Sequence, residues 1–550
     1  MNLQKPIRIA VNRTTKMVLI EGPFPRAAAI LGRYLEKITG AHFAVNPVEC
    51  ILPSFVFAKH HPKEDEEPLG ESGFIYRIFD KDIRFEAETE QAAVYAVYDF
   101  LERVVGCRYF TSSEEYVPYD ANLTVCFEET RMVPILDFRE VYYWDFEDPA
   151  FAEKHKMAPS KQHQGWGFWC HSFQNLVPAE EFFDSHPEYF SLREGKRIGK
   201  NSQLCLSNPE VFDLLVRRLR IEVEKHPEAK YWSVSQNDND AYCECEECRR
   251  LNEEDGSPMG SVLRFVNRVA AEFPDKIIST LAYWYTRTAP KLTRPDENVH
   301  IMLCNIEANR GLPIEVDPRS VSSKQELLDW KEICDHLFLW DYCVQFRNLV
   351  SPFPNLRVLA PNIRFFVENH VRALFSQCNG LRGGEFSALR GYLLAKLMWE
   401  PDRDSEEIIR EFLDGYYKQA APFILRYIDR MQAVSEESGG ELNIFGGPLD
   451  AADTYLAPAL LAEYDRLFDE AEAAVSADSE LLFRVRTARL SLQYAEICLD
   501  YGTVEERLAR IASFAAQARR TGLEMVEERD ITLDRFVTDE LARLAGQKGW

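Results

Sequence analysis

Apolar and polar positions in residues 1–128 follow the period of strands and the period of helices in turn. The predicted strands are 17–21, 55–58, 74–79 and 82–86, and the last two alternate like a hairpin. Helices are predicted over 25–38 and 89–105, because Gly40 and Gly106 stand just past their ends, where helices commonly stop. We therefore expect residues 1–128 to form a small α/β domain.

In residues 129–400, apolar runs of strand length alternate with amphipathic helices. The predicted strands are 135–142, 165–170, 203–206, 231–235, 277–284, 299–306, 337–342 and 373–377. Among the helices, the clearest follows Asn208 and Pro209, a capping residue and a proline suited to the first turn. Eight strands with interleaved helices indicate a closed (β/α)8 TIM barrel. The alternative is a doubly wound open sheet, although no glycine-rich dinucleotide-binding turn follows an early strand.

Beyond residue 400 the strand pattern stops and amphipathic periodicity continues. The predicted helices are 406–435, 457–475, 479–501, 504–521 and 532–545, with a glycine-rich loop over 439–448. We therefore expect a helical domain over 401–550 that packs on the barrel or on another copy of the chain in a homo-oligomer. The full prediction is an α/β protein with three parts.

Composition narrows the classes of partner. The net charge of −25 disfavours nucleic acid and anionic membranes, since both need basic surfaces. The chain has no apolar run long enough for a transmembrane helix, and residues 1–18 lack the architecture of a signal peptide. An odd number of cysteines, 13, is typical of reduced thiols. We expect a cytoplasmic protein without a membrane partner.

The residues that directly follow the strands of a TIM barrel form its active site. Asn237 and Asp238 follow the fourth predicted strand, and an amide beside a carboxylate suits chemistry directed by a substrate's acetamido group. The alternative is a turn and helix cap, for which both residue types are favoured. Glu307 follows the sixth strand as a general acid or sugar-binding group, with a structural ion pair to Arg310 as the alternative.

Further residues near strand ends are candidates for substrate binding. They are His171, Tyr283, Trp340, Asp341, Tyr342, Gln377 and Glu385. Arg139 in the first strand joins them, because an arginine that points into a barrel needs a ligand or a partner, for which Asp137 is the candidate. The alternatives are core packing for at least one of Tyr283, Trp284 and Tyr285, a structural role for His171 and helix capping for Glu385.

Three cysteines, Cys243, Cys245 and Cys248, form a C-x-C-x2-C run. Thiolates at this spacing can bind zinc, but a tetrahedral site needs a fourth ligand, and none is identifiable nearby. Free thiols are the default interpretation, and a disulfide is the alternative in oxidising surroundings. The prediction therefore includes neither a metal nor a cofactor.

Several longer stretches resemble a bacterial glycan-degrading family. They are 234–239 with the cysteine run, 186–190, 204–209, 260–267, 279–283, 340–342 and 383–386. Through them the chain resembles glycoside hydrolase family 163, which was formerly described as a domain of unknown function. Residues 93–102 and 106–110 resemble the small α/β domain that precedes the barrel in β-hexosaminidases and α-glucuronidases.

The resemblance implies an endo-β-N-acetylglucosaminidase that acts on N-glycan-type oligosaccharides. It also implies a retaining mechanism in which the substrate's acetamido carbonyl is the nucleophile. Related barrel enzymes carry two adjacent acidic residues after the fourth strand, whereas this chain has Asn237 and Asp238, so the roles of Asp238 and Glu307 stay open. The alternatives are a glucuronidase-like hydrolase, in which Arg139 or Arg310 binds a uronate, and a non-catalytic carbohydrate-binding barrel.

Overall fold

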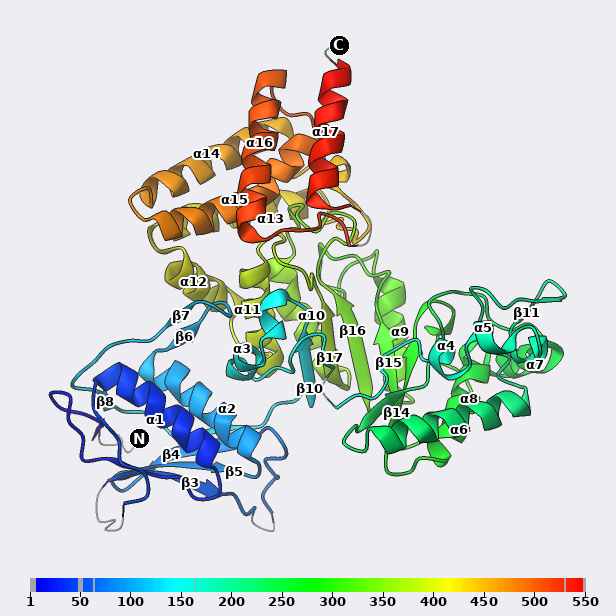
Figure 1. Cartoon of the computed structure of the whole chain (residues 1–550), viewed down its shortest axis with the longest axis horizontal. Helices are drawn as coiled ribbons and strands as arrows, with labels where there is room; N and C mark the ends of the chain where they lie inside the picture. The colour runs from blue at the N-terminus through cyan, green and yellow to red at the C-terminus, as the bar shows by residue number, and fades with distance from the viewer. Residues whose placement is uncertain (1–5, 48–52, 63–64, 164, 529–530, 548–550) are drawn as a thin grey trace.

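The protein is described by a computed structural model that covers residues 6–47, 53–62, 65–163, 165–528 and 531–547 (Figure 1). Its N-terminal part contains a five-stranded sheet covered on one face by α1 (Pro25–Thr39) and α2 (Glu90–Phe100). The strand order is β2 (Val18–Ile20), β3 (Ser54–Lys59), β5 (Asp82–Ala87), β4 (Phe74–Phe79) and β9 (Thr130–Met132). The predicted hairpin is confirmed, because β4 and β5 pair antiparallel.

A curled, six-stranded parallel sheet forms the centre of the molecule (Figure 1). Its order is β10 (Phe138–Val141), β17 (Val371–Gln377), β16 (Leu337–Tyr342), β15 (Val299–Cys304), β14 (Ile277–Ala282) and β13 (Tyr231–Ser233). Each of these six overlaps a predicted strand, and every neighbouring pair is parallel. Since parallel strands end at the same edge, the residues after them gather there.

The closed eight-stranded barrel is not confirmed. In the predicted strand 165–170, only Trp166 forms an isolated bridge, to Tyr231. Gly165 has φ of 85°, and a Cβ at Gly167 would come within 2.3 Å of the Trp232 ring. Left-handed and tightly packed glycines interrupt the run of extended residues that a strand needs. The central sheet of the described residues is therefore a half-barrel.

The predicted strand 203–206 also differs. There Leu204 forms an isolated antiparallel bridge to Phe190, outside the central sheet. The side chain of Gln203 explains the difference, because its Nε2 donates to the carbonyl oxygens of Asn237 and Asn239, both at 2.8 Å. The segment fastens the loop after β13 and adds no strand to the sheet.

Helices surround the central sheet and continue into the C-terminal part, which lies at the top of Figure 1. Their bounds are α6 (Pro209–Lys225), α8 (Met259–Ala271), α9 (Val321–Lys331), α10 (Leu356–Glu368), α11 (Ser387–Trp399), α12 (Ser405–Tyr416), α13 (Ala421–Glu437), α14 (Pro458–Ala474), α15 (Ser479–Cys498), α16 (Val504–Thr521) and α17 (Leu533–Gln547). The single helix predicted over 406–435 is two helices, since Lys418 takes a left-handed φ of 52° between them. Among the described residues, no helix combines the length and apolarity needed to cross a membrane.

Candidate active site

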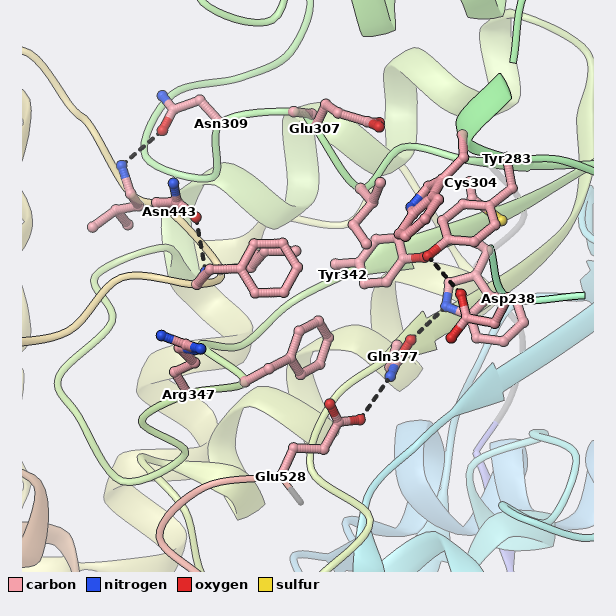
Figure 2. Close-up of a pocket in the computed structure, with 18 of the residues that line it drawn as sticks. Asp238, Tyr283, Cys304, Glu307, Asn309, Tyr342, Arg347, Gln377, Asn443 and Glu528 are labelled. Atoms are coloured by element: carbon pink, nitrogen blue, oxygen red, sulfur yellow. Dashed lines mark hydrogen bonds between the residues drawn. The ribbon is translucent and has the colours of Figure 1, made fainter. Parts of the chain in front are cut away.

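A cavity of about 1020 Å³ lies at the carboxyl ends of β13 to β17 (Figure 2). The side chains that these strands and their following loops contribute are Asp238, Tyr283, Cys304, Glu307, Trp340, Tyr342 and Gln377. Loops of the C-terminal helices complete the lining with Glu441, Leu442, Asn443, Ile444, Phe445, Glu527 and Glu528. A large concavity at strand ends with a few convergent polar groups is the usual form of a ligand site.

Asp238 is the carboxylate that the loop after β13 presents to the cavity. The hydroxyl of Tyr283 donates to its Oδ1 at 3.3 Å (Figure 2). Burial and the negative charge of Asp238 together raise the pKa of Tyr283 far above its ordinary value, so this hydroxyl stays a proton donor. Burial, and then Asp238, also raise the pKa of the Cys170 thiol to about 12.

The loop that carries Asp238 is fixed by buried amides. Gln236 Nε2 donates to Thr286 Oγ1 at 2.7 Å, and Asn237 N–H donates to Gln203 Oε1 at 2.9 Å. The side chain of Asn237 is used in the same way, because its Nδ2 donates to Ser202 O at 2.8 Å. Asn237 therefore holds the loop, and the structure does not bring its amide into the cavity lining.

His171, a predicted binding residue, lines the same end of the cavity. Its Nδ1 lies 2.7 Å from the carbonyl oxygen of Gln236. Because a carbonyl only accepts, Nδ1 carries the proton in this contact, and Nε2 remains available to a ligand hydroxyl. His171 has φ of 51°, and its N–H donates to Ser235 Oγ at 2.9 Å, which anchors this strained position.

Glu307 lies on the cavity wall with 38 % of its side chain exposed. Its ion-pair partner is Arg287, so the alternative, a structural pair with Arg310, is not formed. Arg310 is buried and donates to Asn305 O at 2.7 Å. Behind the pair, Glu326 Oε1 lies 3.5 Å from Arg287 Nε, and burial together with the charge of Glu307 raises the pKa of Glu326 to about 7.

Aromatic side chains form much of the remaining surface. Trp340 and Tyr342 come from β16, and the indole Nε1 of Trp340 donates to Gln377 Oε1 at 2.7 Å (Figure 2). Trp284 and Phe445 add exposed rings. Aromatic faces next to hydrogen-bonding groups suit a ligand that has both apolar and hydroxyl-bearing surfaces. Among the described residues, the side-chain groups spaced to hold a metal ion lie outside this cavity lining.

The family model described as "Domain of unknown function (DUF4838)" matches residues 109–429, which contain the whole central sheet. The chain belongs to this family. A search of curated proteins finds no match to the chain. The DUF4838 domain therefore identifies the family without assigning an activity.

Solved structures of glycoside hydrolases are similar to this chain. A family GH115 4-O-methyl-alpha-glucuronidase, BtGH115A, matches 94 % of this chain and 77 % of its own at 10 % identity, with a TM-score of 0.55. The Flavobacterium johnsoniae chitobiase FjGH20 matches 99 % and 98 % at 13 % identity and a TM-score of 0.46. A GH138 enzyme that targets pectin rhamnogalacturonan II matches 97 % and 99 % at 10 % identity and a TM-score of 0.47. Of these three, BtGH115A is close enough to show a shared fold.

Three predicted binding residues of the DUF4838 domain lie away from the cavity. Asp341 is buried, and its Oδ1 accepts from Asn305 Nδ2 at 2.8 Å. Glu385 forms a buried ion pair with Arg390. Asp341 faces away from the cavity because side chains alternate along a strand, and its neighbours Trp340 and Tyr342 face the cavity.

Arg139 is the third of these residues, and its side chain faces the outer helices. Its guanidinium lies 5.0 Å from the ring centre of Trp399 in α11, and its Nε donates to Lys156 O at 3.0 Å. The concave side of β10 instead carries Phe138, whose ring lies 5.3 Å from that of Phe338 in β16. The side chains of β10 therefore alternate in the opposite sense to the prediction. Glu140, and not Arg139, is the charged residue on the concave side, and its Oε2 lies 3.2 Å from His163 Nδ1.

Two parts of the cavity were not predicted from the sequence: the loops outside the DUF4838 domain, and Arg347, which lies inside that domain. The loops 441–445 and 527–528 contribute carboxylates and the ring of Phe445, and Arg347 contributes a cation (Figure 2). The glycine-rich loop over 439–448 was the available signal, since loops of this composition between helices often carry function. Nothing in the sequence places it next to β15 and β16.

Proposed function

We propose that this protein is a glycoside hydrolase that cleaves β-linked N-acetylglucosamine in N-glycan-type oligosaccharides. The main support is the hydrogen-bonded pair of Asp238 and Tyr283 beside aromatic rings, in a cavity at the strand ends. The fold shared with BtGH115A, which is named a glucuronidase, supports hydrolysis of a glycosidic bond. The resemblance to glycoside hydrolase family 163 supports the choice of sugar.

We assign Asp238 the proton transfers. In the first step, the substrate's acetamido oxygen attacks the anomeric carbon, the glycosidic bond breaks, and Asp238 gives its proton to the departing oxygen. In the second step, Asp238 takes a proton from water as the water oxygen attacks the same carbon and the bond from this carbon to the acetamido oxygen breaks, which restores the acetamide with retained configuration. The Tyr283 hydroxyl stabilises the carboxylate that forms between these steps.

Glu307 takes a different role in this scheme. A guanidinium partner stabilises a charged carboxylate, and Arg287 supplies one. A carboxylate oriented by this ion pair can accept the acetamide N–H and increase the electron density on the attacking oxygen. Glu307 is therefore the orienting group, and His171 and Gln377 bind sugar hydroxyls.

A second candidate is a glucuronidase-like hydrolase. Arg139 and Arg310 do not support it, because both are buried in contacts outside the cavity lining. Arg347 favours it, since this exposed guanidinium lies on the cavity wall, where a uronate carboxylate would find a bidentate donor.

The test compares purified full-length protein on an aryl N-acetyl-β-glucosaminide, an aryl glucuronide and defined N-glycans. Cleavage of the first and third with retained configuration, together with inhibition by a thiazoline that mimics the cyclised acetamido intermediate, is the expected result. Cleavage of the glucuronide without thiazoline inhibition would establish the second candidate. Sugar binding without hydrolysis of any glycoside would make the protein a non-catalytic carbohydrate-binding protein and contradict both.

Two substitutions test the assigned residues. Asp238→Asn should lower kcat by roughly 100- to 10,000-fold, the usual contribution of a general acid and base. Glu307→Gln should lower kcat on substrates with an acetamido group and leave the melting temperature unchanged. The matched control is Asp240→Asn, an exposed acid of the same loop that does not line the cavity. Wild-type turnover in Asp238→Asn would remove it from the mechanism.

A further inference from the structure

Four cysteine thiols that were separated in the sequence meet in the structure outside the cavity. The Sγ atoms of Cys205, Cys243, Cys245 and Cys248 all lie within 4.8 Å of one another. Three of the four side chains are buried, and that of Cys245 is half-buried. Cys205 is the fourth thiol that the C-x-C-x2-C run lacks, and it comes from the segment that fastens the loop after β13.

The spacing of these thiols matches tetrahedral metal coordination. Four sulfurs at about 2.3 Å from a central zinc ion lie about 3.8 Å from each other. The Sγ atoms of Cys205 and Cys245 are 3.7 Å apart. This separation is much longer than the ~2.05 Å bond of a disulfide, and none of these four cysteines forms a disulfide.

The surroundings stabilise thiolates. Cys245 is the N-cap of α7 (Glu246–Asp255) and Cys248 lies in its first turn, where the positive end of the helix dipole favours negative charge. The backbone N–H of Leu192 donates to Cys243 Sγ at 3.4 Å. Arg197 Nη1 lies 3.8 Å from the same sulfur, and its cation offsets the net negative charge of a tetrathiolate zinc site.

We propose that Cys205, Cys243, Cys245 and Cys248 bind a structural zinc ion. Four protein ligands close the coordination sphere, which is typical of structural and not of catalytic zinc. Soft thiolates in tetrahedral arrangement select zinc or iron among the common metals, and zinc is the one that we assign.

The zinc site holds the loop that carries Asp238. Gln203, two residues before Cys205, donates to the carbonyl oxygens of Asn237 and Asn239 on either side of Asp238. Cys205 lies on the segment of Gln203, and Cys243 lies on the loop of Asp238. One ion bound by both cysteines therefore joins the two segments that Gln203 connects. This positioning role rests on the proposed function, whereas the metal site does not.

The metal content of the full-length protein, purified without added metal or chelator, tests the site. Mass spectrometry of the metal should find about one zinc per chain, as four thiolates bind one ion. A thiol-modifying reagent should release this zinc as four cysteines react. Protein without metal, whose four thiols react freely in the folded state, or a disulfide between two of them would overturn the proposal, and iron in place of zinc would overturn the assigned metal.

Variants locate the ion. Cys205→Ser should lose the bound zinc, while Cys126→Ser, at an exposed cysteine elsewhere, should keep it. Where Cys205→Ser fails to fold, replacement of zinc by Co²⁺ in the wild-type chain gives a second measurement. Thiolate-to-cobalt charge-transfer absorption supports the site, and a spectrum without it overturns the site. These readouts need no activity, so an inactive protein that binds zinc would contradict only the proposed function.

Discussion

The cavity has two walls of different origin. The strand wall consists of Asp238, Tyr283, Glu307, Trp340, Tyr342 and Gln377, all inside the segment 109–429 that defines the DUF4838 family. The helical wall consists of Glu441, Asn443, Phe445, Glu527 and Glu528, all beyond that segment. The strand wall holds the carboxylates to which we assign chemistry. In the proposed function, the strand wall therefore carries the reaction, and the helical wall contributes further contacts with the substrate.

The two walls are joined by hydrogen bonds through Phe346. Its N–H donates to Ile444 O at 2.8 Å, and its carbonyl accepts from Glu528 N–H at 2.9 Å. Asn309 adds a second link, because its Oδ1 accepts from Leu442 N–H at 2.7 Å (Figure 2), and its Nδ2 donates to Gly440 O, also at 2.7 Å. These four hydrogen bonds hold the helical wall against the strand wall.

Asn309→Ala should have the largest effect on this arrangement. The substitution leaves the carbonyl of Gly440 and the N–H of Leu442 without their buried partner, at a cost of roughly 3 kcal/mol in the free energy of unfolding. We expect a lower melting temperature and a higher KM, since the helical wall loses its link. The control is Asn443→Ala, whose side chain accepts only from Phe445 N–H at an exposed position. Equal melting curves for both variants would show that the walls do not depend on the link.

Tyr283→Phe tests the strand wall. Loss of a hydrogen bond to a charged group costs about 1.5–3 kcal/mol. We therefore expect kcat to fall roughly 10- to 100-fold with little change in KM. The control is Tyr285→Phe, two residues further on, whose ring stacks on Tyr242 at 4.9 Å outside the cavity lining. A similar loss in both variants would indicate damage to the loop and not loss of the hydrogen bond to Asp238.

The strand wall could be predicted from the sequence because it depends on local pattern. Each strand end is marked where an apolar run stops, and the parallel sheet brings these ends to one edge. Asp238, Glu307 and Gln377 each follow such a strand end and line the cavity, and their catalytic and binding roles stay predictions. Asp341 does not line the cavity, although strict alternation from its neighbours would have excluded it.

The remaining features depend on contacts that the sequence pattern does not encode. Cys205 meets the cysteine run only because the segment 203–206 turns to the loop after β13 instead of entering the sheet. The helical wall reaches β15 and β16 through loops whose direction depends on how α13 to α17 pack. Arg287 as the partner of Glu307 is a side-chain contact between two strand-end loops, which periodicity does not predict.

Phe445→Ala should change substrate affinity by a smaller amount. The ring is 55 % exposed in the free protein, so its loss should leave the melting temperature unchanged. Loss of one aromatic contact with a bound sugar should raise KM by roughly 3- to 10-fold, equivalent to about 1 kcal/mol, with kcat unchanged. The control is Leu449→Ala, which is 73 % exposed and does not line the cavity. If Phe445→Ala keeps the wild-type KM on every substrate, the helical wall takes no part in substrate recognition.

Glu326→Gln should have the smallest effect, visible in pH dependence. The pKa of Glu326 is raised from 4.5 to about 7 in the folded protein, mainly by burial, so the folded state binds its proton more tightly than the unfolded state. Its contribution to stability is full below pH 4.5 and is lost as the pH rises through 7. The charged form also competes with Glu307 for Arg287, which lies 3.5 Å from it.

For Glu326→Gln we therefore expect the melting temperature to fall less between pH 5 and pH 8 than in the wild type. In the wild type we expect kcat to decline above about pH 7, because the charged Glu326 carboxylate then competes with Glu307 for Arg287. In Glu326→Gln this decline should be weaker, because the glutamine amide does not take Arg287 from Glu307. The control is Asp329→Asn on the same helix, which removes an acid without removing the buried proton. Parallel pH curves for the wild type and Glu326→Gln would mean that this proton is not coupled to the strand wall, and Arg287 would then serve Glu307 alone.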